Sequence, residues 1–283
     1  MKLPIKPRNC ISEYIRIPIS ERRSLRMLIV KPQNSEKREP TTGVLWLHGG
    51  GYMSGFPELV YSGRAIDLVT KAGAVVVSPA YKLSIYKPYP AALQDSYAAL
   101  LYMKEHCGEL GIRPDQLMLG GESAGGGLVA ALCMYAKDRG EVNIAFQMPL
   151  YPMLDCYDTP TSANAHFRGW GTIRNHLAWK LYLRSIRGQA VPEYASPSRR
   201  SDYSGLPPAY SFVGDLDPFS FETQEYIENL RRAGVEADMD VHHNFFHAND
   251  IFRAKSAEAK RAAEALVERF KAAVERYHAP QND

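Results

Sequence analysis

LMLGGESAGG, residues 117–126, is the stretch of sequence that decides the fold. A short apolar segment leads into a stretch that is rich in glycine and alanine. Residues 121–125 match G-x-S-x-G, in which a serine occupies a turn so sharp that its neighbours must be small. A glycine-rich helix start packed on a strand would show the same glycines but would not need the serine. The strand–turn–helix context therefore predicts that the Ser123 hydroxyl projects above a sheet as a nucleophile.

The order of strand, turn and helix repeats on both sides of this turn. Short continuous apolar runs, typical of strands buried on both faces of a parallel sheet, occur at residues 43–47, 74–78, 117–119, 144–148 and 210–213. Helical patterns occupy residues 91–106, 124–137, 220–233 and about 254–277. Residues 12–18 and 24–30 alternate apolar and polar side chains and indicate an antiparallel hairpin at a sheet edge. These patterns predict an α/β fold with a mainly parallel sheet of about eight strands and helices on both faces.

One segment, residues 152–197, interrupts this order. It lacks a strand pattern and contains a helix-like run at 176–186. We interpret it as a small cap insertion that folds over the C-terminal edge of the sheet, where ligands bind in open α/β proteins. The whole chain, residues 1–283, is then expected to form one domain.

Composition excludes several classes of function. The 34 basic and 31 acidic residues give a net charge of +3, and no block of like charge suggests binding to nucleic acid. The chain has no apolar run long enough to span a bilayer, and its first residues lack the apolar core of a signal peptide. The four cysteines are widely spaced and no Cys/His group resembles a metal site. We therefore expect a cytoplasmic protein without a membrane span, metal or cofactor.

A second glycine motif, HGGGY at residues 48–52, follows the apolar run 43–47. Glycines let backbone N–H groups approach a substrate closely, and such donors stabilise the negative charge that develops on a carbonyl oxygen during acyl transfer. A phosphate-binding loop is the alternative interpretation, but no GK[ST] follows the glycines. The motif therefore predicts an oxyanion hole.

The two glycine motifs together resemble the hormone-sensitive-lipase-like branch of the α/β-hydrolase family. The resemblance extends from about residue 40 to 255 and includes YPAALQD at 89–95, GLPPA at 205–209 and GDLDP at 214–218. It implies the α/β-hydrolase fold and a carboxylesterase that needs no cofactor. It also implies that Gly50, Gly51 and Ala124 donate N–H groups to the oxyanion, while His48 and Gly49 shape the loop.

Enzymes of this fold order their triad as serine, acid and histidine. The run 210–213 leads to two candidate acids, Asp215 and Asp217. The resemblance places the acid immediately before a proline, which selects Asp217 and leaves Asp215 as a helix cap or a solvent-exposed residue. The resemblance also selects His247, just before the final long helix, as the base. Family members often carry glycine where Asn244 stands, and asparagine tolerates the same left-handed backbone.

Two other carboxylates, Glu122 and Asp95, are expected to make structural polar contacts. Substrate choice is expected to depend on the insertion. Candidate walls of the substrate pocket are Tyr52, Tyr151, Phe167 and Trp170. The N-terminal part is short compared with many members of the branch, which suggests a reduced cap and small ester substrates.

Several related functions stay open at this point. An arylformamidase, a lactonase or a deacylase of sugar or feruloyl esters would use the same residues. Some relatives are hormone receptors that bind a ligand without turnover, although they typically lose a member of the triad. A homodimer is also conceivable, because relatives often associate through the edge of the sheet.

Overall fold

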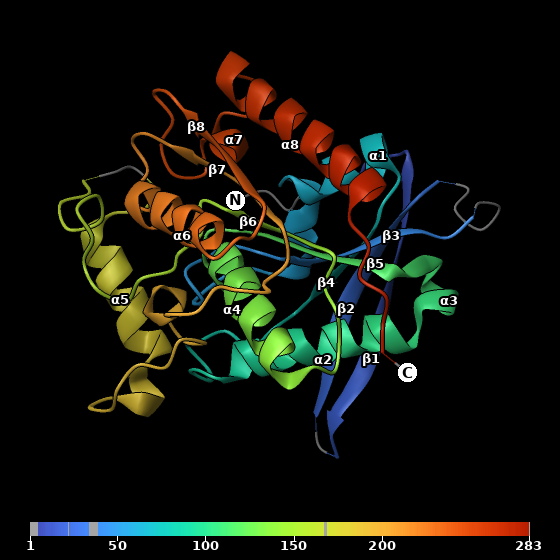
Figure 1. Ribbon diagram of the computed structural model, residues 1–283, viewed down its shortest axis with the longest axis horizontal. Helices are drawn as coiled ribbons and strands as arrows, with labels where there is room; N and C mark the ends of the chain where they lie inside the picture. Colours follow the sequence, from blue (N-terminus) through green and yellow to red (C-terminus); the bar gives the residue numbers. More distant parts are fainter. Residues whose placement is uncertain (1–4, 22, 34–38, 167–168, 283) are drawn as a thin grey trace.

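Eight strands form one sheet at the centre of the computed structural model, which describes residues 5–21, 23–33, 39–166 and 169–282 (Figure 1). The strands are β1 (Cys10–Ser20), β2 (Arg23–Pro32), β3 (Thr41–Leu47), β4 (Val75–Pro79), β5 (Ile112–Glu122), β6 (Phe146–Leu150), β7 (Ala209–Gly214) and β8 (Ala237–His242). Their order across the sheet is β1-β2-β4-β3-β5-β6-β7-β8. From β4 to β8 all neighbouring strands are parallel, which confirms the predicted mainly parallel sheet.

The predicted N-terminal hairpin is confirmed. β1 and β2 pair antiparallel, and β2 continues the sheet by pairing antiparallel with β4. The hairpin is attached to the domain by Arg23, whose guanidinium Nη1 donates to Asp95 Oδ2 at 2.9 Å. The Asp95 side chain is fully buried and also accepts from the Lys82 backbone N–H, so its expected structural role is confirmed.

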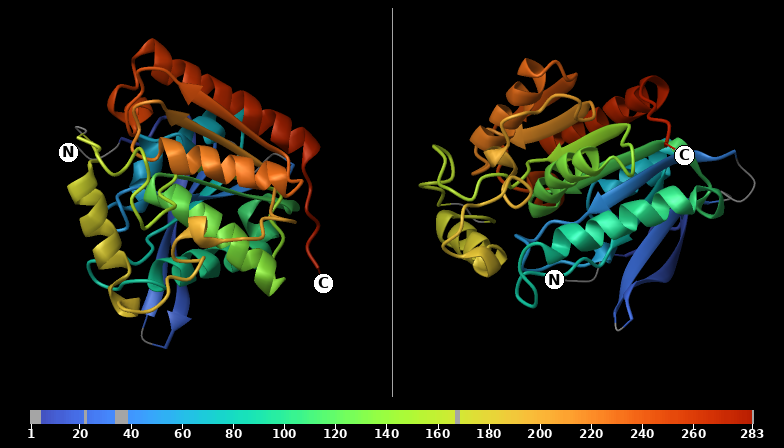
Figure 2. Two further views of the ribbon diagram at one scale, coloured as in Figure 1. Left: turned by 60° about the vertical axis from the view of Figure 1, so that its left-hand side comes forward. Right: turned by 60° about the horizontal axis from the view of Figure 1, so that its bottom comes forward.

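Helices cover both faces of the sheet (Figures 1 and 2). α1 (Ala65–Ala72) and α8 (Ala257–Arg276) pack on one face, and α2 (Ala91–Glu105), α4 (Ala124–Arg139) and α6 (Ser220–Arg232) pack on the other. β3 contributes side chains to both layers. Val44 and Trp46 face α1 and α8, whereas Leu45 and Leu47 face the opposite layer. The remaining elements are η2 (Pro57–Tyr61), α3 (Cys107–Leu110), α5 (Thr172–Tyr182), η3 (Arg184–Ile186), η4 (Pro197–Arg199) and α7 (Asn249–Phe252).

The insertion contains one regular α-helix among its described residues, and its bounds differ from the prediction. α5 begins at Thr172 rather than at 176, and it ends at Tyr182 because residues 184–186 form the separate 3₁₀ turn η3. Tyr182 stacks on Tyr52, which lies in the loop after β3, with ring centroids 4.0 Å apart. The insertion therefore lies against the carboxyl end of the central strands (Figure 2).

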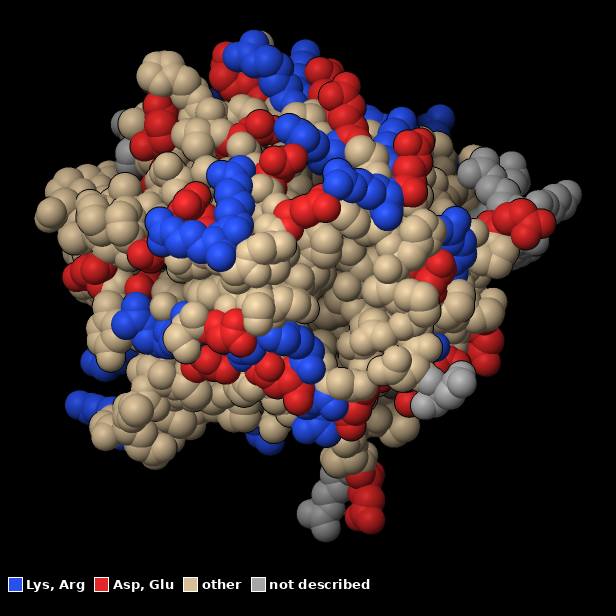
Figure 3. All heavy atoms as spheres, in the orientation of Figure 1, with Lys and Arg blue, Asp and Glu red and all other residues tan. Residues whose placement is uncertain are grey.

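Basic and acidic side chains alternate over the face shown in Figure 3. No single-sign field covers this face, in keeping with the near-neutral net charge. Within the described parts of the chain, none of the helices combines the length and the apolar character needed to cross a membrane.

Close packing between α4 and β3 generates the first testable prediction. A Cβ atom on Gly125 would lie 2.0 Å from the Leu47 carbonyl oxygen, whereas a Cβ on Gly108 would meet nothing within 4 Å. Gly125→Ala is therefore expected to lower the free energy of unfolding by about 1–3 kcal/mol or more. Gly108→Ala, the matched control, is expected to leave it unchanged or slightly raised. Urea unfolding measures both, and equal effects would contradict the close approach.

Candidate active site

Ser123 occupies the turn between β5 and α4 with a φ of 56° and a ψ of −121°. This backbone conformation is strained for a residue with a side chain, and such strain persists only where the surroundings enforce it. The enforcing contacts are the backbone hydrogen bonds from the Ser123 N–H to Leu150 and from the Met153 N–H to the Ser123 carbonyl. The turn therefore fixes the direction of the Ser123 hydroxyl.

His247 and Asp217 lie beside Ser123. The Nε2 atom of His247 is 2.9 Å from Ser123 Oγ, and its Nδ1 atom is 2.9 and 3.0 Å from the two carboxylate oxygens of Asp217. All three residues are at most 6% exposed. Because Nδ1 donates its proton to the carboxylate, Nε2 is left as an acceptor for the serine proton. The structure thus brings together the three residues that the sequence predicted, in an order suited to activating a nucleophile.

The loop between β8 and α7 carries His247. Asn244 has a φ of 53°, so the asparagine adopts the left-handed conformation expected of it. The Gly214 backbone approaches this loop closely, because a Cβ on Gly214 would lie 1.7 Å from the Phe245 carbonyl oxygen. The end of β7, which precedes Asp217, is therefore packed directly against the histidine loop.

The second candidate acid lies outside this arrangement. Asp215 is exposed, and its carboxylate accepts hydrogen bonds from His243 Nδ1 at 2.6 Å and from the Phe245 backbone N–H at 3.3 Å. His243 is itself largely exposed. Asp215 therefore supports the histidine loop at the surface, whereas the buried Asp217 faces His247.

The glycine loop after β3 lies opposite the serine. Gly50 and Gly51 have φ angles of 124° and 61°, which glycine adopts without a steric penalty. Ala124 is the first residue of α4, so its N–H lies at the positive end of a helix dipole. Among the residues that the structure describes, none accepts a hydrogen bond from the N–H of Gly50, Gly51 or Ala124. These three N–H groups are therefore available to a ligand.

The buried side chain of His48 helps to hold the glycine loop in place. Its ring stacks on Tyr81 with centroids 4.2 Å apart, and the Tyr81 hydroxyl donates to the His48 carbonyl oxygen at 2.7 Å. The His48 Nδ1 atom lies 2.9 Å from the carbonyl oxygen of Gly49. Burial lowers the pKa of His48 to about 4, so the ring stays neutral. The sequence did not identify Tyr81, although its position just after β4 places it at the same sheet edge as the glycine loop.

The predicted pocket residues occupy different environments. Tyr52 and Tyr151 are buried rather than exposed to a pocket, at 1% and 0% exposure. Tyr52 has a φ of 60°, which turns its side chain away from the loop and into contact with α5. Trp170 is 7% exposed, and its ring covers Gly51, where a Cβ would lie 2.0 Å from the indole. Phe167 lies outside the described residues.

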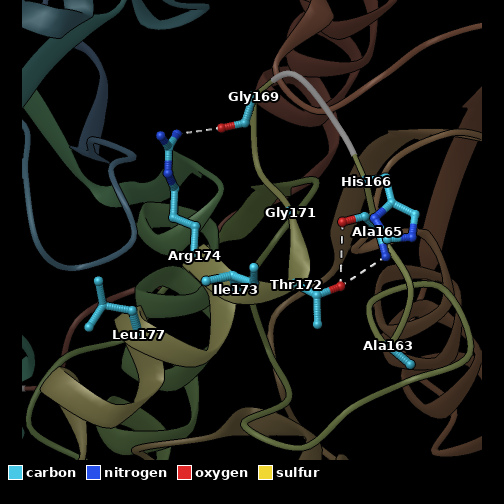
Figure 4. Close-up of a pocket in the computed structure, with 9 residues that line it drawn as sticks. All are labelled: Ala163, Ala165, His166, Gly169, Gly171, Thr172, Ile173, Arg174 and Leu177. Atoms are coloured by element: carbon cyan, nitrogen blue, oxygen red, sulfur yellow. Dashed lines mark hydrogen bonds between the residues drawn. The ribbon is translucent and has the colours of Figure 1, made fainter.

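A cleft of about 780 Å³ opens beside these residues (Figure 4). Its walls come from the insertion and include Ala163, Ala165, Ile173 and Leu177. Figure 4 shows Arg174 extended toward Gly169, whose carbonyl oxygen accepts from the guanidinium at 2.7 Å. The cleft adjoins the histidine loop, because a Cβ on Gly169 would lie 3.5 Å from the His247 carbonyl oxygen. Its mainly apolar lining suits a hydrophobic group.

The described residues near the triad include no metal-binding group. Over residues 5–21, 23–33, 39–166 and 169–282, no group of three or more His, Cys, Asp or Glu side chains could hold a metal ion. The other carboxylate of the serine turn, Glu122, accepts from Trp46 Nε1 at 2.8 Å and from the Arg64 N–H at 3.2 Å, as expected of a structural partner.

Comparisons with known proteins identify the family of this chain. A family model for the alpha/beta hydrolase fold matches residues 44–250. The carboxylesterase NlhH of Mycobacterium tuberculosis is 31% identical over 208 residues, which cover 72% of this chain and 65% of NlhH. The esterase LipI of the same organism is 32% identical over 200 residues, covering 69% of this chain and 62% of LipI. The chain belongs to the α/β-hydrolase family, and it spans slightly less than two thirds of the length of these relatives.

A solved structure extends the likeness to nearly the whole chain. A bacterial heroin esterase superimposes with a TM-score of 0.89 at 31% sequence identity, over 94% of this chain and 85% of that one. The predicted fold class, an α/β-hydrolase fold with a mainly parallel sheet and helices on both faces, is therefore confirmed.

Protonation of His48 generates a prediction about pH. The folded protein holds this ring with a pKa of about 4 against an ordinary value of 6.5, so unfolding takes up a proton between these values. The stability is fully present above pH 6.5 and is lost as the pH falls toward 4. Between about pH 7.5 and about pH 5, the wild type should lose about 2 kcal/mol more than His48→Asn. Urea unfolding at both pH values tests this, and parallel losses would contradict it.

Proposed function

We propose that the protein is a serine hydrolase that cleaves small carboxylic esters, with Ser123, His247 and Asp217 as its catalytic triad. The observation that carries this proposal is the continuous hydrogen-bonded chain from Ser123 Oγ through both ring nitrogens of His247 to the Asp217 carboxylate. The curated relatives are named as a carboxylesterase and an esterase, which supports the same reaction class.

The proposed reaction has two halves. Ser123 Oγ attacks the ester carbonyl carbon while His247 Nε2 accepts the hydroxyl proton, and Asp217 stabilises the resulting imidazolium. The tetrahedral intermediate then collapses as His247 returns the proton to the leaving alcohol, which forms an acyl-serine. Water, deprotonated by His247, attacks the acyl group and releases the carboxylic acid. A free serine hydroxyl is regenerated at the end of each cycle.

The oxyanion of each intermediate is assigned to the N–H groups of Gly50, Gly51 and Ala124. Their unoccupied donors support this role, as does the position of Ala124 at the start of the 16-residue helix α4. Loss of one such donor typically costs about 10²–10³ in kcat. The contacts between His48 and Tyr81 keep this loop in place beside Ser123.

We further propose that the acyl group of the substrate is short. Trp170 covers Gly51 closely, which limits the space directly above the oxyanion loop. Lactones, aryl formamides and acetylated or feruloylated sugars could be attacked by the same residues, so a substrate panel is needed to choose among them.

We also propose that the protein is cytoplasmic and forms a homodimer. The four cysteines carry free thiols, which suits a cytoplasmic protein in a reducing compartment. β8 lies at an edge of the sheet, and an edge strand can pair with a second copy to form a homodimer.

Hydrolysis of p-nitrophenyl acetate, butyrate, octanoate and palmitate tests the proposed activity. Turnover should be fastest with the short esters, and Ser123→Ala should lower kcat by about 10⁴ or more because the nucleophile is lost. The fold of the variant is checked by circular dichroism. Undiminished hydrolysis by Ser123→Ala would refute the proposal, and tight ligand binding without turnover by the wild type would favour a receptor.

A pair of variants tests the choice of acid. Asp217→Asn should lower kcat by about 10²–10⁴, because the amide no longer fixes the tautomer of His247 or stabilises its charge. Asp215→Asn, in the exposed neighbour on the same loop, should stay within about threefold of the wild type. Both are measured with p-nitrophenyl acetate, and the opposite ranking would assign the role to Asp215.

A further inference from the structure

A buried ionic cluster lies behind the candidate triad. Its centre is Arg64, only 7% exposed, just before α1. The guanidinium Nη1 lies 3.0 Å from Asp67 Oδ2, and Nε lies 3.3 Å from Asp250 Oδ2. Asp250 belongs to α7 and its side chain is fully buried. A buried cation thus joins two elements, α1 and α7, that are far apart in the sequence.

The cluster contacts the elements that carry both ends of the Ser123–His247 hydrogen bond. Asp250 follows His247 by three residues in the sequence, and the Ile251 N–H hydrogen bonds to Ala248 within the same short segment. On the other side, Glu122 directly precedes Ser123 and accepts the Arg64 backbone N–H at 3.2 Å. Arg64 therefore connects the serine turn to the histidine loop through two direct contacts.

Tyr151 fills the space between the cluster and the histidine. Its ring packs edge-on against His247 with centroids 5.2 Å apart. Burial raises the pKa of its hydroxyl, and the neighbouring Asp250 carboxylate raises it further. Tyr151 therefore lies between one face of the His247 ring and the Arg64–Asp250 pair.

The charges of the cluster do not balance when all groups are ionised. Arg64 faces the carboxylates of Asp67, Asp250 and Glu122, and Lys71 at the surface pairs with Asp67 at 2.8 Å. Burial raises the pKa of Glu122 to about 7 and also raises the pKa of Asp250, whereas Arg64 and a protonated His247 oppose the shift at Asp250. The Asp250 carboxylate and a protonated His247 therefore attract each other.

A contribution to the stability of the fold does not by itself explain why such a buried ionic cluster is present. Replacing a buried ion pair by apolar residues of similar volume is often neutral or stabilising, whereas removing one partner leaves an uncompensated charge. A requirement for position gives a stronger reason, because the ion pair and the hydrogen bond from Arg64 Nη2 to the Asp250 carbonyl oxygen tie the guanidinium to the segment that follows His247.

We propose that Arg64 and Asp250 are positioning residues that fix His247 against Ser123 and support its positive charge during the reaction. This inference rests on the proposed function. Neither residue touches the substrate or the reacting atoms. Asp217 orients the ring through Nδ1, and the Arg64–Asp250 pair holds the chain segment and the ring face behind it.

The test compares four variants with the wild type on p-nitrophenyl acetate. Asp250→Asn and Arg64→Met should each lower kcat by about 10-fold or more with KM within about twofold, because positioning acts on the chemical step. Arg64→Lys should recover part of the loss by restoring the charge. Arg200→Met is the control, since Arg200 is equally buried and pairs with Asp138 and Glu193 on another part of the molecule.

The pH profile separates positioning from general stability. In Asp250→Asn the acidic limb of kcat/KM should move to lower pH, because a negative charge that favours protonated His247 is gone. Arg200→Met should lower the melting temperature yet keep the wild-type kcat and acidic limb. Asp250→Asn is nearly isosteric and should fold. Its kcat and pH profile can therefore be measured even if Arg64→Met does not fold.

Three results would decide the matter. A folded Asp250→Asn with wild-type kcat and an unmoved acidic limb would overturn the inference while the esterase proposal stands. Equal losses of kcat in Asp250→Asn and Arg200→Met would also overturn it, because they would indicate a general loss of stability. A wild type without Ser123-dependent turnover would refute the proposed function itself.

Discussion

The close approach of α4 to β3 is the constraint on which the rest of the structure depends. Glycine at position 125 lets the helix backbone pass within contact distance of the Leu47 carbonyl, and this contact sets the angle of the turn that carries Ser123. The same β3 strand ends in the glycine loop, so the packing of α4 on β3 places both Ser123 and the N–H groups of Gly50, Gly51 and Ala124. A larger side chain at this contact would displace both features together.

The histidine is held less directly than the serine. Ser123 lies on a turn between a strand and a helix, whereas His247 lies on a loop between β8 and α7. Two left-handed residues, Asn244 and Ala248, shape this loop, and Asp217 contacts the histidine ring. The proposed role of the buried pair of Arg64 and Asp250 is to hold this loop in place.

Much of this could be predicted from the sequence because the informative patterns are local. Apolar runs marked the buried strands, and G-x-S-x-G marked the turn. Tyr52 shows where local patterns fail, since its positive φ buries a side chain that was expected in a pocket. The contact between Arg64 and Asp250 could not be predicted either, because the two residues are 186 positions apart in the sequence and meet only in the folded chain. The predicted end of helix α5 was too late, since the helical pattern continues into the 3₁₀ turn that follows it.

Covalent labelling with a fluorophosphonate tests whether Ser123 is an activated nucleophile, and it needs no knowledge of the natural substrate. The reagent phosphonylates a serine only when a neighbouring base activates it. Peptide mass spectrometry should locate a single stoichiometric label on Ser123, and His247→Ala should react far more slowly. Absence of labelling at Ser123 in the folded wild-type protein, or a label on another residue, would contradict the account.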